Sequence, residues 1–220
     1  MSARLVIFDV DGTLVDSQAH ILAAMTRAYA ALGLEAPARA EVLEIVGLSL
    51  PVAVARLVPF LGAGEQARLV EAYKQAFAEL RAEPLSPLYP GAGEMLNLLA
   101  RDRSLILGIA TGKSRRGLAH IVAAHSWEGR FATMQVADDH PSKPHPAMLQ
   151  ACLRETGIAP GQAVMVGDTR YDMEMAEAAG IKGLGVSWGY HPAEALGAHV
   201  IDDFSDLPEA LERIWNGGKA

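Results

Sequence analysis

Strand-like and helical segments alternate through the C-terminal part of the chain, and this alternation restricts the fold more than any other feature. The predicted strands are 105–110, 134–137, 163–167 and 183–187, with a short element at 199–201, and the predicted helices are 91–101, 114–125, 146–156, 170–179 and 207–215. Such alternation is typical of a mostly parallel sheet with helices on both faces, because parallel strands need long crossover connections. Leu5 to Phe8 form an apolar run that predicts one more buried strand. The sequence therefore predicts an α/β fold.

A block of helices interrupts this alternation directly after the first strand. Helical patterns cover 17–32, 38–46, 50–58 and 65–82, and no strand pattern occurs from residue 16 to residue 83. Ser17 is a candidate N-cap of the first helix, and Gly33 is a candidate stop. We predict a small all-helical cap domain at 16–83, inserted into a Rossmann-like core formed by 1–15 and 84–220. Both connections leave from the carboxyl end of the sheet, so the helical block can cover that end.

Composition and charge argue against several classes of protein. The 220 residues are 50% hydrophobic and 20% charged, which is typical of a globular chain. The formal net charge of −7 argues against nonspecific binding to nucleic acid or anionic membranes, which needs basic patches. The longest uncharged apolar run, 105–111, is far too short to span a membrane, and residues 2–4 show no signal-peptide pattern. Because Cys152 is the single cysteine, no intrachain disulfide can form, and we expect a cytoplasmic protein.

Two carboxylates follow the first predicted strand. Asp9 ends the apolar run, and Asp11 comes two residues later, just before Gly12. Residues i and i+2 of an extended chain point to the same side, so both carboxylates can enter the crevice at the carboxyl end of the strand. Like charges this close repel each other, and a bound cation or a shifted pKa is the usual remedy. The alternative is a pair of surface aspartates in a turn, where Asp and Gly are common.

Other predicted strands also end in residues that could bind phosphate or a cation. Thr111 and Gly112 precede a helix, where a hydroxyl and free N–H groups can bind an anion, although an ordinary N-cap is the alternative. Lys143 lies among prolines that fix the backbone, and its alternative is a solvated loop lysine. Asp168 ends a further strand and Asp172 follows one helical turn later, where an N-cap and a solvated acid are the alternatives.

Together these strand ends predict a site for phosphoryl transfer. Asp9, Asp11 and Asp168 would form an acidic pocket suited to Mg²⁺, which takes one or two carboxylates, keeps several waters and accepts phosphate oxygens. The hydroxyl, the amide and the lysine would neutralise an anionic phosphoryl group. In phosphoryl transfer, positioning and charge neutralisation supply most of the catalysis.

These motifs resemble those of the haloacid dehalogenase-like hydrolase superfamily. Its four motifs are similar, in order, to Phe8-Asp9-Val10-Asp11-Gly12-Thr13, to Thr111-Gly112, to Lys143 and to Gly167-Asp168-Thr169-Arg170-Tyr171-Asp172. The resemblance covers nearly the whole chain, and the joint occurrence of the motifs at strand ends and helix starts is highly specific. The helical block resembles the small cap of the phosphoglycolate phosphatase-like branch, and its substrate-facing loop resembles Val46-Gly47-Leu48-Ser49-Leu50.

The resemblance implies a role for each matching residue. Asp9 would attack phosphorus and form an aspartyl-phosphate, and Asp11 would protonate the leaving oxygen and then activate the hydrolytic water. Because dehalogenases and P-type ATPases lack an acid at the Asp11 position, dehalogenation and ion pumping are not expected. Mg²⁺ would be held by Asp9, the Asp11 backbone carbonyl and Asp168. The other implied roles are phosphoryl binding by Thr111, the Gly112 amide and Lys143, substrate contact by Gly47, and orientation of Lys143 or metal-bound water by Asp172.

The sequence thus predicts a Mg²⁺-dependent phosphatase for a small organic phosphomonoester, with phosphoglycolate as the best single candidate. The alternative enzyme is a hexose-phosphate mutase of β-phosphoglucomutase type, although such mutases usually carry Arg where this cap loop has Leu50. A non-catalytic phosphate-binding protein is a third interpretation, but a binding module has no need of Asp11. Arg115 and Arg116 open a helix and could reach a substrate carboxylate, or they could be solvated. We expect a monomer or a small homo-oligomer.

Overall fold

One parallel sheet organises the structure, a computed structural model that describes residues 3–80 and 86–217. The strands are β1 (Arg4–Phe8), β2 (Leu105–Thr111), β3 (Thr133–Val136), β4 (Ala163–Gly167), β5 (Lys182–Val186) and β6 (Val200–Ile201). They form a six-stranded sheet in the order β3-β2-β1-β4-β5-β6, and each of these neighbouring pairs is parallel. This is the Rossmann-like order, in which the chain reverses its direction of travel beside the first strand. The α/β prediction is confirmed.

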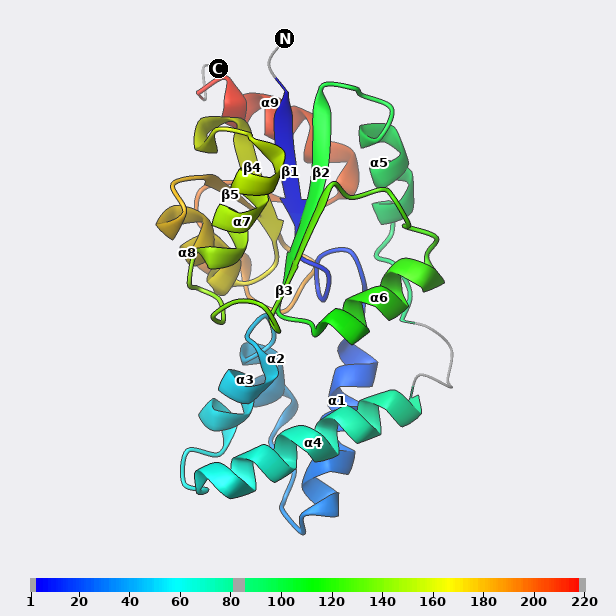
Figure 1. The fold of residues 1–220 in the computed structure, drawn as a ribbon, viewed down its shortest axis with the longest axis vertical. Coiled ribbons are helices and arrows are strands. Elements are labelled where there is room, and N and C mark those ends of the chain that lie inside the picture. Colours follow the sequence, from blue (N-terminus) through cyan, green and yellow to red (C-terminus); the bar gives the residue numbers. More distant parts are fainter. Residues whose placement is uncertain (1–2, 81–85, 218–220) are drawn as a thin grey trace.

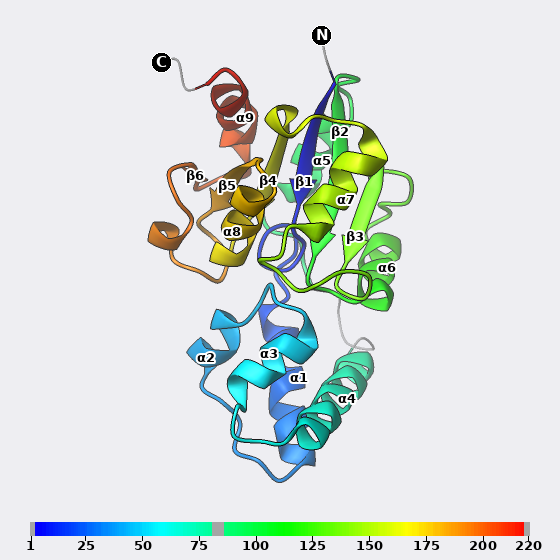
Figure 2. The ribbon, with the colours of Figure 1, turned by 60° about the vertical axis from the view of Figure 1, so that its left-hand side comes forward.

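Helices cover both faces of the sheet (Figures 1 and 2). Helices α5 (Ala92–Leu99), α6 (Arg115–Ala124) and α9 (Leu207–Trp215) pack in one apolar core, and α7 (Ala147–Thr156) and α8 (Arg170–Ala178) pack in the other. Strand β1 serves both cores because its side chains alternate: Val6 and Phe8 join the first core, and Leu5 and Ile7 join the second. Each of these four side chains is fully buried, which stabilises the fold by about 1.5–3 kcal/mol per side chain.

Four helices lie apart from the sheet, at the lower end of the molecule in Figure 1. They are α1 (Gln18–Ala31), α2 (Arg39–Glu44), α3 (Leu50–Leu57) and α4 (Ala63–Leu80). They share a third apolar core, in which Met25, Tyr29, Val54 and Leu69 are buried. We call this group the cap. Its predicted boundary at 83/84, and the predicted helical residues 81 and 82, fall outside the described residues, so the division at 16–83 stays a proposal.

The start of the cap differs from the prediction in one contact. Helix α1 begins after Ser17, as predicted, and Gly33 follows the helix with φ of +70°. The Ser17 side chain makes no capping hydrogen bond, however, because its hydroxyl donates to the Asp11 carboxylate instead. Ser17 is therefore tied to a residue of the predicted site and not to its own helix. Among the helices of 3–80 and 86–217, none combines the length and apolarity needed to cross a membrane.

Candidate active site

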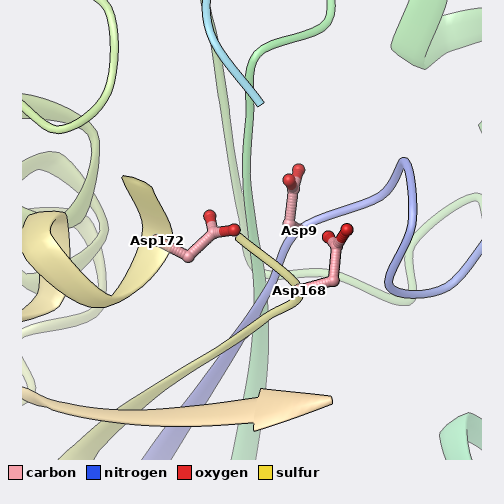
Figure 3. Close-up of side chains that lie close together, drawn as sticks. All are labelled: Asp9, Asp168 and Asp172. Atoms are coloured by element: carbon pink, nitrogen blue, oxygen red, sulfur yellow. The ribbon is translucent and has the colours of Figure 1, made fainter. Parts of the chain in front are cut away.

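Three carboxylates converge where the sheet meets the cap. Asp9 follows β1 and Asp168 follows β4, and these strands are neighbours in the sheet. Asp172 joins them from the first turn of α8 (Figure 3). One oxygen from each carboxylate lies within 4.8 Å of the others. This is the crevice beyond the carboxyl ends of the strands, at the switch point where open α/β sheets bind ligands.

The first turn of α8 explains how Asp172 comes to be buried. Thr169 is the N-cap of α8, and its hydroxyl accepts a hydrogen bond from the Asp172 N–H. One Asp172 oxygen in turn accepts from the Thr169 N–H at 3.1 Å. This reciprocal capping box fixes the Asp172 side chain against the core. The alternatives of a solvated first-turn acid at Asp172 and an N-cap at Asp168 are therefore wrong.

Lys143 is buried among these carboxylates. Its Nζ lies 2.9 Å from Asp9 Oδ2 and donates to Asp172 Oδ1 at 2.6 Å, and only 1% of its surface is exposed. The alternative of a solvated loop lysine is therefore wrong. In the part of the chain that the structure describes, the three buried carboxylates of this cluster thus have one buried ammonium beside two of them, and negative charge is in excess.

The pKa values of the site follow from this imbalance. Burial raises the pKa of Asp9 from 3.8 to about 6, against the opposing effect of the Lys143 ammonium. Burial also raises the pKa of Asp168 well above its usual value, and the Asp172 and Asp9 carboxylates raise it further. Burial alone would lower the pKa of Lys143, but Asp172 and Asp9 more than offset this and raise it. The site would gain from one more positive charge.

The donor atoms of this cluster fit a hard divalent cation. Asp9 Oδ2 is buried and accepts no hydrogen bond of good geometry, although Lys143 lies close to it. Asp168 is held in place, since it accepts from Thr13 Oγ1 at 3.0 Å and from the Tyr190 N–H at 2.9 Å. A cluster of carboxylate oxygens with spare acceptor capacity suits Mg²⁺. The cluster contains Asp9 and Asp168 of the predicted metal set, together with Asp172.

The Asp11 side chain points to a different set of partners. Its two oxygens accept from Lys113 Nζ at 2.6 and 2.8 Å, and Oδ1 also accepts from the Ser17 hydroxyl. The Ser17 hydroxyl lies 3.1 Å from the Tyr190 hydroxyl. Sequence reasoning gave none of these three neighbours a role in the site. The proposed metal contact of Asp11 involves its backbone carbonyl and stays a prediction.

Thr111 and Gly112 stand at the start of α6, as predicted. Ser114 is the N-cap of α6, and its hydroxyl accepts from the Gly117 N–H at 3.1 Å. Thr111 is 1% exposed, and its hydroxyl accepts from the Lys113 N–H at 3.3 Å. Because Ser114 and not Thr111 caps the helix, the Thr111 hydroxyl can donate to an anion.

The cap loop rests directly on this corner. A Cβ atom on Gly112 would lie 2.5 Å from the carbonyl oxygen of Gly47, so only a glycine allows this approach. Gly47 itself has φ of +96°, and a Cβ on it would lie 3.0 Å from Thr169 Oγ1. Next to it, the Ser49 N–H donates to Ser142 Oγ at 2.9 Å. The loop at 46–50, which we predict to face the substrate, thus lies close to Gly112 after β2 and to Thr169 after β4.

Polar contacts at the start of α8 also join the cap to the core. The Tyr171 hydroxyl donates to the Glu44 carbonyl at 3.0 Å and accepts from Arg56 Nη1 at 2.8 Å. Arg170 Nη2 lies 2.8 Å from Glu44 Oε1, and both side chains are about half exposed, so the ion pair is worth less than about 1 kcal/mol. Polar contacts thus join the cap to the core on both sides of the crevice.

A cavity of about 560 Å³ lies between the cap and the predicted catalytic residues. Core residues Asp9, Asp11, Thr111, Gly112 and Lys113 line one side of it, and the cap supplies a mostly apolar wall that includes Ile21, Met25, Leu48, Leu50, Tyr73 and Phe77. Arg116 lines the cavity as well. Arg115 does not, because it pairs with Asp139 and its backbone N–H donates to Asp138. The cavity can enclose a small molecule beside the carboxylates.

Known proteins match this chain over nearly its whole length. The family described as Haloacid dehalogenase-like hydrolase matches residues 6–186. The probable phosphatase IndB of Dickeya dadantii is 33% identical over 96% of this chain and 94% of its own length. A phosphoglycolate phosphatase of Yersinia pestis is 32% identical over 94% of this chain and 93% of its own. The crystal structure of a predicted phosphoglycolate phosphatase from Haemophilus somnus has a TM-score of 0.84 at 26% identity, covering 95% of this chain and 98% of that one.

Proposed function

The chain belongs to the haloacid dehalogenase-like hydrolases and is a phosphatase, and we propose that it is a Mg²⁺-dependent enzyme that hydrolyses a small phosphomonoester through an aspartyl-phosphate on Asp9. The observation that carries the proposal is the cluster of Asp9, Asp168 and Asp172, which is buried beside Lys143 and has an excess of negative charge. Phosphoglycolate is the first substrate to test, because similar proteins carry that name. A panel of phosphorylated metabolites with Mg²⁺, read by released phosphate, tests the activity and ranks the substrates.

In the proposed first step, an Asp9 oxygen attacks phosphorus and the bond to the leaving oxygen breaks. Asp11 gives its proton to that leaving oxygen, so the product departs as an alcohol. Thr111, the Gly112 amide and Lys143 hold the phosphoryl oxygens, and Asp172 orients Lys143 through their 2.6 Å hydrogen bond. Asp9, the Asp11 carbonyl and Asp168 would hold Mg²⁺, which when bound neutralises charge on the phosphoryl group.

In the proposed second step, Asp11 is a carboxylate and takes a proton from water. The water oxygen attacks phosphorus, the bond from phosphorus to Asp9 breaks, and phosphate leaves. Asp11 ends the cycle protonated, ready for the next leaving group. Closure of the cap over the substrate would exclude bulk water and so strengthen the electrostatic contacts in the cavity.

A hexose-phosphate mutase is the less favoured alternative. Such mutases usually carry an arginine at the cap position of Leu50, and here Leu50 presents an apolar side chain to the cavity. The nearest arginine of the same helix, Arg56, is engaged with Tyr171 on the other side of the cap. A hexose 1-phosphate in the panel separates the two: a phosphatase releases phosphate, whereas a mutase yields the 6-phosphate.

Removal of the metal should abolish activity. The carboxylate cluster is short of positive charge, so we expect phosphate release to stop with EDTA and to return with Mg²⁺. Ca²⁺ should support it poorly, because Ca²⁺ is larger and takes more ligands. Phosphate release is the measurement, and full activity in metal-free buffer would rule out the Mg²⁺ assignment.

Binding of Mg²⁺ should also be visible without turnover. Because the pKa of Asp9 is about 6 in the folded protein and 3.8 is its ordinary value, metal-free stability should fall as pH rises between these values. Mg²⁺ binds the ionised carboxylates, so it should raise Tm more at about pH 7.5 than at about pH 5. At a hundredfold excess over Kd the gain is about 2.7 kcal/mol, or roughly 5–10 °C. NaCl of equal ionic strength is the control, and the Asp168→Asn variant should lose the effect.

A bulky residue at Gly47 should damage turnover of the physiological substrate more than that of a small aryl phosphate. Gly47→Leu would press against Thr169 and Tyr171, so the cap could not rest on the core as it does in this structure. A misplacement of about 1 Å can cost about 10²-fold in rate for a substrate whose turnover depends on closure of the cap. The kcat/KM values of both substrates are the measurement.

The matched control for Gly47 is Gly33→Leu. Gly33 lies in the same cap with φ of +70°, but nothing lies within 4 Å of the position of a Cβ on it. Gly33→Leu therefore introduces a similar backbone strain, but the new side chain does not press against the core. Equal losses on both substrates in Gly47→Leu, matched by Gly33→Leu, would mean that Gly47 only shapes the cap.

A further inference from the structure

Lys113 contacts both oxygens of the Asp11 carboxylate, and it has no role in the two steps proposed above. Its Nζ lies 2.6 Å from one Asp11 oxygen and 2.8 Å from the other, so one ammonium spans both. The two side chains are 8% and 13% exposed, and this shields the pair from solvent and salt. A short contact to both oxygens fixes the direction of the Asp11 carboxylate.

We propose that Lys113 is a positioning residue that sets the direction of the Asp11 carboxylate for proton transfer. This inference rests on the proposed function, in which Asp11 is the acid and base. Lys113 does not transfer a proton itself. It keeps the carboxylate turned toward the cavity, with help from the Ser17 hydroxyl on Oδ1.

Lys113 is itself held firmly enough for this task. Its N–H donates to Thr111 Oγ1 at 3.3 Å, and its carbonyl accepts from the Ala137 N–H at 3.1 Å. The backbone is therefore fixed on both sides at the end of β2. The ammonium also lies 5.4 Å from the centre of the Phe77 ring, which belongs to the cap helix α4. The attraction between a cation and the face of an aromatic ring therefore adds a contact between Lys113 and the cap.

A different role for Lys113 would be direct contact with an anionic group of the leaving alcohol, since Lys113 lines the cavity. The two roles differ in the second half of the reaction. When the aspartyl-phosphate is hydrolysed the leaving alcohol has gone, so a substrate contact no longer matters. A residue that positions Asp11 still matters, because Asp11 must then take a proton from water.

The decisive measurement is therefore the decay of the phosphoenzyme. Wild type, Lys113→Met and Lys113→Arg are phosphorylated with radiolabelled p-nitrophenyl phosphate, chased with unlabelled substrate and quenched in acid at set times. We expect decay at least about tenfold slower in Lys113→Met, which is part of the 10²–10⁴-fold that acid–base assistance is worth. Lys113→Arg keeps the charge and a two-oxygen contact and should recover part of the rate.

The same change at a remote site is the control for loss of charge. Lys182 is exposed at the start of β5, the end of the sheet away from the carboxylates, and Lys182→Met should decay like wild type. Decay in Lys113→Met at the wild-type rate, with a loss only in phosphorylation by an anionic substrate, would overturn the proposal and assign Lys113 to substrate contact.

Crystal structures of wild type and Lys113→Met give a readout that needs no turnover. We expect the Asp11 carboxylate to leave its present direction when Lys113 is lost and to keep it in Lys113→Arg. An unmoved Asp11 in Lys113→Met would overturn the proposal. If wild type released no nitrophenolate, the proposed function would fail, while the crystal structures would still report whether Lys113 directs Asp11.

Discussion

Replacement of Asp9 with Asn should abolish turnover of every phosphate ester. The amide is nearly the same size as the carboxylate but is not a nucleophile, so no aspartyl-phosphate forms. Loss of the attacking group in covalent catalysis costs orders of magnitude, and we expect about 10⁴-fold or more in kcat. The measurement is phosphate release from phosphoglycolate and from p-nitrophenyl phosphate, together with acid-quenched phosphoenzyme.

The folded protein should tolerate this change well. Asp9 is fully buried, and its pKa is raised to about 6 because burial disfavours the charged form. The neutral Asn removes one of three crowded carboxylates, so Tm in metal-free buffer at neutral pH should stay equal to that of wild type or rise. Retained Tm with no activity would separate lost chemistry from unfolding.

An exposed aspartate provides the matched control for Asp9→Asn. Asp102 lies on the surface in the turn before β2, where its carboxylate accepts from Ser104. Asp102→Asn makes the same chemical change far from the crevice and should keep full activity. Substantial phosphoenzyme in Asp9→Asn would mean that another residue is the nucleophile, and the assignment of Asp9 would have to be abandoned.

The fold could be predicted from local patterns because those patterns report burial. Leu5 to Phe8 are apolar without alternation, and the structure buries them on both faces of the sheet. Parallel pairing then follows from helices between strands, and the position of Asp9 and Asp168 follows from parallel pairing. Once β1 and β4 are neighbours, residues that end them must lie close together.

The surroundings of Asp11 could not be predicted in the same way. Lys113 and Asp11 are 102 residues apart, and Ser17 and Tyr190 are 173 residues apart. Their contacts depend on side-chain directions in loops, where no periodic pattern exists. Ser17 also carried a misleading signal, because a serine before a helix is most simply explained as an N-cap. Lys113 follows Thr111 and Gly112 directly in the sequence, but its positive charge does not indicate which of the carboxylates it contacts.

Replacement of Asp11 with Asn should separate the two half-reactions. In the first, Asp11 protonates the leaving oxygen, which matters for an alkoxide of high basicity but much less for p-nitrophenolate, which leaves without a proton. In the second, Asp11 deprotonates water, and this step is the same for every substrate. The Asn variant should therefore be phosphorylated by p-nitrophenyl phosphate and then hydrolyse its aspartyl-phosphate about 10²–10⁴-fold more slowly.

Rapid mixing with p-nitrophenyl phosphate measures both steps at once. Asp11→Asn should give a burst of nitrophenolate close to one equivalent of enzyme, followed by a slow steady state. With an alkyl phosphate the same variant should form little phosphoenzyme, measured after an acid quench. Asp16→Asn is the matched control, because Asp16 follows within the same segment but its side chain accepts from the Gln18 N–H and does not line the cavity. It should behave like wild type. Equal losses on alkyl and aryl phosphates, without a burst, would mean that Asp11 shapes the backbone or the metal site and moves no proton.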